Sequence, residues 1–172
     1  MTTTATTFQS FLNARQPEDG QILIALRYYM SEVTDDKLPE EMLDDIASQV
    51  DDRAALVRAR EEFAKDQASQ VAAALLFFST AWDDPAERAR IERAFDAVST
   101  KLPVVEMAIL AIVGMYALFL TRTGGVKTVT KTTRRKKDGS SETTFAQENF
   151  SPTEPIMGVI SVLTGRKRKE GA

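Results

Sequence analysis

The sequence predicts a mainly α-helical protein: an N-terminal helical bundle, one long hydrophobic helix, and then a small basic β-hairpin and a tail. Three features of its 172 residues support this prediction. Apolar residues recur every three or four positions along residues 8–102, residues 103–121 are almost wholly apolar, and residues 125–150 resemble two strands around a turn. Residues 1–7 are mostly Thr and are expected to form a flexible N-terminus.

Charge divides the chain into two halves of opposite sign. The net charge of −3 arises from 22 Lys and Arg against 25 Asp and Glu. Residues 1–100 carry a net charge of −9, and residues 101–172 carry a net charge of +6. An acidic half joined to a basic half indicates that the two halves meet different surroundings.

The acidic half, residues 8–102, is predicted to be a domain of amphipathic helices. One helix is expected over residues 21–33, after a break at Asp19-Gly20. Pro39 suits the first position of the next helix, and Asp51 can cap the helix after that.

The strongest core candidates lie in residues 71–82 and in the helix that follows them. Asp84 can cap this second helix, and Pro85 fits its first position. The two helices carry apolar stripes at helical spacing, which are Val71, Leu75, Phe78 and Trp82 in the first and Ile91, Phe95, Val98 and Leu102 in the second.

The apolar segment 103–121 has no polar face, so it must be buried either in lipid or at the centre of a protein core. As a helix it covers about 25–28 Å, just under a bilayer core of about 30 Å. The bases that follow it favour a membrane helix, while the amphipathic helices before it could instead enclose it. The residues assigned to the membrane-facing helix are Val104, Val105, Ile109, Leu110, Ile112, Val113, Leu118, Phe119 and Leu120.

Small residues recur along the same segment at Ala108, Ala111, Gly114 and Ala117. Small side chains let two helix backbones approach closely, so these four residues are candidates for a helix-packing seam. Such a seam would serve self-association or contact with a protein partner.

Residues 125–150 are predicted to form a basic β-hairpin. Thr and Val favour strands, and the Lys137-Asp138-Gly139-Ser140 run favours the turn between them. The apolar run 156–163 in the final segment, 151–172, is too short to span a bilayer and is expected to be a third strand or a short helix.

Two basic clusters are candidates for contact with an anionic partner. They are Arg134, Arg135, Lys136 and Lys137 near the hairpin turn, and Arg166, Lys167, Arg168 and Lys169 in the tail. An anionic membrane surface is the preferred partner, because juxtamembrane bases are attracted to anionic headgroups. Nucleic acid is less favoured, because no aromatic side chains interleave with the bases.

No catalytic chemistry is indicated. The chain has no Cys and no His, which excludes a disulfide framework, a Cys or His zinc site and a His-dependent catalytic triad. No phosphate-binding loop, EF-hand or nucleophile elbow is present, so no cofactor or metal is expected.

The sequence therefore predicts a small non-enzymatic interaction or scaffold protein, tethered to a membrane by helix 103–121 with its basic C-terminal side in the cytoplasm. The alternative is a soluble cytoplasmic helical binding module that holds helix 103–121 in its core. In a variant of this alternative, the helix is released to insert into a membrane, as in a pore-forming effector.

Overall fold

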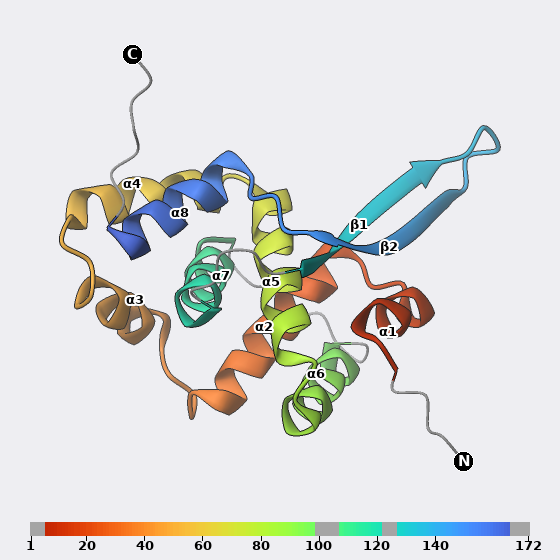
Figure 1. The fold of residues 1–172 in the computed structure, drawn as a ribbon, viewed down its shortest axis with the longest axis horizontal. Helices are drawn as coiled ribbons and strands as arrows, with labels where there is room; N and C mark the ends of the chain where they lie inside the picture. The colour runs from red at the N-terminus through yellow and green to blue at the C-terminus, as the bar shows by residue number, and fades with distance from the viewer. Residues whose placement is uncertain (1–5, 99–106, 122–126, 166–172) are drawn as a thin grey trace.

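The computed structural model describes residues 6–98, 107–121 and 127–165, which form a helical body and a two-stranded β-hairpin (Figure 1). The predicted fold class is confirmed. In chain order the elements are α1 (Phe8–Arg15), α2 (Asp19–Val33), α3 (Pro39–Ala47), α4 (Arg53–Ala64), α5 (Gln67–Ala81), α6 (Pro85–Val98), α7 (Met107–Thr121), β1 (Lys127–Arg135), β2 (Ser141–Asn149) and α8 (Glu154–Thr164).

Short polar side chains start several of the helices. Asp52, rather than the predicted Asp51, caps α4 by accepting a hydrogen bond of 2.9 Å from the backbone N–H of Ala55. The predicted break at Asp19-Gly20 is wrong, because both residues belong to the first turn of α2. Gln21 stabilises this turn by accepting a hydrogen bond from the backbone N–H of Glu18 at 2.8 Å.

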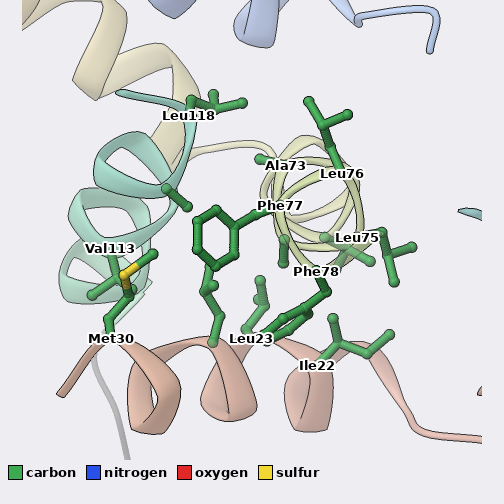
Figure 2. Packing of buried hydrophobic residues seen from close by; sticks show 14 of the residues in the cluster. Ile22, Leu23, Met30, Ala73, Leu75, Leu76, Phe77, Phe78, Val113 and Leu118 are labelled. Carbon is green, nitrogen blue, oxygen red and sulfur yellow. The ribbon is translucent and has the colours of Figure 1, made fainter. Parts of the chain in front are cut away.

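Helix α7 lies at the centre of the body and contacts α2, α3, α4, α5 and α8 (Figure 1). Figure 2 shows Phe77 of α5 pointing into the space between α5 and α7, above α2. Burial of the largely apolar surface of α7 against five other helices is favourable, because it removes that surface from water.

The predicted stripe on α5 is confirmed, since Val71, Leu75, Phe78 and Trp82 are all buried. Trp82 closes one end of the core, where its ring lies 5.3 Å from Phe8 and 4.9 Å from Phe11, centroid to centroid. Its indole N–H donates to the backbone carbonyl of Thr6 at 2.8 Å, which fixes the start of the described chain against α5.

The predicted hairpin is confirmed. Strands β1 and β2 pair antiparallel from Lys127 opposite Asn149 to Arg135 opposite Ser141. The apolar run after it is helical, so the expectation of a third strand is wrong and that of a short helix is right. Helix α8 buries Ile156 and Val159 and lies against α4 and α7.

Candidate binding surface on the β-arm

The hairpin, here called the β-arm (residues 127–149), is anchored at its root and projects from the helices at its tip (Figure 1). Val129 and Phe145 are buried, and the strands contact α5 and α1. A two-stranded hairpin is marginally stable alone, so this packing is what holds the arm in place.

Asn13 of α1 binds the root of the arm through both ends of its amide. Its Nδ2 donates to the carbonyl oxygen of Phe145 at 3.2 Å, and its Oδ1 accepts from the N–H of Phe145 at 3.0 Å. On the other strand, the N–H of Val129 donates to Oγ of Ser79 at 3.3 Å. Side chains of the helical body thus satisfy backbone groups on both outer edges near the root.

Lys131 adds a charged contact between the arm and the body. Its Nζ lies 2.8 Å from a carboxylate oxygen of Asp19 and 3.3 Å from the carbonyl oxygen of Pro17. The acidic first turn of α2 therefore holds a base from the basic half of the chain.

The tip is a tight turn over Lys136–Ser140. The N–H of Lys136 donates to the carbonyl of Ser140 at 2.8 Å, and Gly139 adopts a positive φ of 89° that favours glycine. The hydroxyl of Ser140 and its backbone N–H both donate to Asp138, and these bonds lower the pKa of the Asp138 carboxyl. Asp138 therefore shapes the turn on which the bases are presented.

The structure places the four predicted bases Arg134, Arg135, Lys136 and Lys137 together at this tip, all of them exposed. Lys136 lies 3.4 Å from Glu142. In the part of the chain that the structure describes, the other three bases have no ion-pair partner. Their charges are therefore available to an anionic partner.

The other predicted basic cluster, Arg166 to Lys169, lies outside the described residues, as do Val104 and Val105. Among the remaining residues assigned to the membrane helix, Leu110, Val113, Leu118 and Phe119 are buried, Ile109 and Ile112 are half-buried and Leu120 is exposed.

The part of the predicted segment 103–121 that the structure describes is the 15-residue helix α7 inside the protein. Across residues 6–98, 107–121 and 127–165, none of the helices combines the length and the apolar character needed to cross a membrane. The transmembrane expectation therefore has no support from these residues.

Of the predicted helix-packing residues, the structure places Ala111, Gly114 and Ala117 in the core and leaves Ala108 exposed. Gly114 lies against α4, where a Cβ atom would be 2.9 Å from Cε1 of Phe63. The small side chain at this position lets the Phe63 ring approach the α7 backbone.

A polar cluster that no sequence pattern predicted joins α3 to α7. Lys37 and the Tyr116 hydroxyl both bind the Asp45 carboxylate, and these bonds hold the pKa of Asp45 below its ordinary value. Burial, followed by the bond to Asp45, raises the pKa of Tyr116. These three residues connect elements far apart in the sequence, so no local pattern could have revealed them.

The lowered pKa of Asp45 predicts a contribution to acid sensitivity. A carboxyl whose pKa is lower in the folded state stabilises the fold at pH values above its ordinary pKa of 3.8. This contribution is lost as the pH falls through the pKa of the folded state. Asp45→Asn is therefore expected to reduce the loss of stability between neutral pH and about pH 3. Urea denaturation across this range checks it, and an unchanged pH profile would contradict it.

Two clefts lie beside the arm. One, of about 500 Å³, is bordered mainly by polar side chains from the start of α1, the end of α5 and the strands. The other, of about 350 Å³, lies between α5 and β1, with Lys131 and Thr133 on one side and Ala68 and Ala72 on the other. In the described residues, no three His, Cys, Asp or Glu side chains gather as a metal site.

Comparison with protein-family models, with curated proteins and with solved structures finds no match to the chain. Function is therefore inferred from the arm and from the body that holds it.

Proposed function

We propose that the chain is a non-enzymatic binding module whose helical body holds the basic β-arm out to an acidic protein partner. The observation that carries the proposal is the exposed cluster Arg134–Lys137, which sits at the end of an arm anchored by α1, α2 and α5. A fixed cluster of like charges steers an oppositely charged partner and selects against partners of the same sign.

The side chains near the tip of the arm favour an acidic protein as the partner over an anionic membrane or a nucleic acid. Residues 132–144 contain no aromatic and no aliphatic side chain beyond the methyl groups of Thr. The tip therefore offers no apolar group to insert into a bilayer and no ring on which a nucleobase can stack. Its two exposed strands instead carry hydrogen-bonding backbone groups that suit another polypeptide.

Neutralising the tip is the first test. The variant R134Q/R135Q/K136Q/K137Q is expected to bind a Glu-rich peptide about tenfold or more weakly than the parent chain, because exposed ion pairs each contribute a modest amount. Binding by the parent chain is expected to weaken as salt rises from about 0.05 M to about 0.5 M, because salt screens exposed charges. Isothermal titration calorimetry measures both effects.

A matched control removes four bases from another surface. Arg53, Arg58, Arg60 and Lys65 lie on or just after α4, and the described residues hold no ion-pair partner for them. Because R53Q/R58Q/R60Q/K65Q changes the net charge equally, it is expected to bind within about twofold of the parent chain. Equal losses in the two variants would mean that net charge alone governs binding, and the proposal would fail.

The anionic membrane surface expected from the sequence is the competing candidate, with the same tip bases as its support. Flotation with phosphatidylserine vesicles and with neutral phosphatidylcholine vesicles compares it directly with the peptide. If the chain binds the anionic vesicles more tightly than the peptide, and the tip variant loses this binding, the partner is a lipid surface and not an acidic protein. Leakage of dye from the same vesicles tests whether α7 is released into a bilayer.

A further inference from the structure

The hydrogen-bonding phase of the β-arm shows which backbone groups face outward. The pair Lys136 and Ser140 is hydrogen-bonded across the hairpin, so the even-numbered residues of β1 bond to β2. The odd-numbered residues of β1 therefore direct their N–H and C=O groups away from β2. The outward bonds of Val129 and Phe145 to the helical body agree with this phase.

The two outer edges of the arm are not equally open. On β2, Asn13 occupies the outward groups of Phe145, which leaves only Thr143 and Ser141 beyond it. On β1, only the outward N–H of Val129 donates to Ser79. Among the described residues no hydrogen bond reaches the outward backbone groups of Lys131, Thr133 and Arg135, so β1 has the longer uninterrupted run of unbonded outward groups.

Charge decides what can pair with this edge. From Lys131 to Lys137 the chain carries five bases and no acid, and only Lys131 and Lys136 among them pair with described carboxylates, those of Asp19 and Glu142. Pairing β1 with β1 of a second copy would place bases against bases. Such pairing is unfavourable, because like charges opposite each other across two strands are destabilising. Bases on an edge strand are a common protection against such self-pairing. An acidic strand would instead place opposite charges across the ladder.

A cleft continues the same edge toward the helical body. The space of about 350 Å³ between β1 and α5 has Ala68, Val71 and Ala72 on its helical side. Lys131 and Thr133 line it from β1, and Asp19 and Glu148 also border it, so it suits the apolar rather than the acidic side chains of an added strand. A strand lying along β1 would bring its side chains to this cleft, where apolar residues would be accommodated.

We propose that the outer edge of β1, from Lys131 to Arg135, binds an extended acidic segment of a partner protein as a third strand of the β-arm. This inference rests on the proposed function, because it specifies how the acidic partner docks. Main-chain hydrogen bonds to Thr133 and Arg135 supply the register, and the bases supply the preference for acidic side chains.

A pair of proline variants tests the edge. Thr133 and Thr143 lie opposite each other, their hydroxyl oxygens are 3.2 Å apart, and both direct their N–H groups outward. Proline at either position removes an outward donor without removing a hydrogen bond between β1 and β2. The two variants are therefore expected to destabilise the arm equally, but only Thr133→Pro prevents a further strand from pairing with β1.

The probe is a blocked nine-residue peptide that alternates Glu and Val. Thr133→Pro is expected to weaken its binding about tenfold or more, and Thr143→Pro to leave it within about twofold. A control peptide has the same sequence but is N-methylated at alternate residues, so it keeps its charge and cannot complete the hydrogen bonds of a ladder. Its binding to the unaltered protein is expected to be as weak as the binding of the unmethylated peptide to Thr133→Pro.

Equal binding of the N-methylated and parent peptides would overturn the third strand, and this comparison uses the unaltered protein. Loss of binding in the tip variant together with parent-like binding by Thr133→Pro would retain the proposed function and reject the strand. No loss in either variant would reject both. Tighter binding to a DNA duplex or to phosphatidylserine vesicles, unaffected by Thr133→Pro, would reject the peptide as the occupant.

Discussion

Val113→Asp is expected to lower the free energy of unfolding by more than about 4 kcal/mol, because it places a carboxyl in the helical core without a partner. Val113 is 2% exposed, and Figure 2 shows it beside Met30 of α2. Urea denaturation followed by circular dichroism measures the change.

The control for this variant lies on the same helix. Leu120 is 47% exposed, so Leu120→Asp keeps its carboxylate in water and is expected to cost about 1 kcal/mol or less, mainly through the helix dipole. Equal losses at the two positions would contradict the placement of α7 in the core.

The pH dependence of Val113→Asp gives the same prediction a second readout. Burial raises the pKa of the new carboxyl in the folded state above its unfolded value of about 3.9. The folded state then binds more protons than the unfolded state between these two values. The variant is therefore expected to regain stability as the pH falls through this range, and a constant difference from the parent chain would exclude a buried carboxyl.

The contact between Phe63 and Gly114 predicts the second large effect. Phe63→Ala is expected to cost about 3–5 kcal/mol because it empties a fully buried site. Gly114→Leu is expected to cost about 1–3 kcal/mol or more, because even a Cβ atom would lie 2.9 Å from the Phe63 ring.

The two changes are expected to compensate each other in part. A leucine at position 114 can occupy space that Phe63→Ala vacates, so the double variant should cost at least about 1 kcal/mol less than the sum of the single changes. Additive costs would show that the two side chains do not share a site. Gly158 is a control in α8, where the nearest atom to a Cβ is an oxygen of Glu62 at 3.9 Å, so Gly158→Ala is expected to stabilise by about 0.5–1 kcal/mol.

Much of the fold was predictable because its signals are local. The stripe on α5 appears in the sequence as a helical period, and the hairpin appears as Thr and Val around an Asp-Gly turn. The run that forms α8 was ambiguous, because about eight apolar residues suit a strand or a helix equally well.

The environment of α7 was not predictable from its own residues. Lipid and a protein core are both apolar, so a segment without a polar face suits either. The helices that surround α7 distinguish a protein core from lipid. These helices, α2 to α5 and α8, come from other parts of the sequence, so α7 itself does not reveal them. The docking of the arm was hidden for the same reason, since Asn13 and Phe145 are 132 residues apart and neither belongs to a recognisable motif.

Hydrogen exchange on the free protein and on its complex with the Glu and Val peptide tests both the core position of α7 and the pairing of a strand with β1. We expect the amides of α7 to be among the most protected in both states, because the helix lies inside the core. We also expect the amides of Thr133 and Arg135 to exchange fast in the free protein and slowly in the complex. Fast exchange along α7 would contradict its burial, and no new protection on the outer edge of β1 would contradict the third strand.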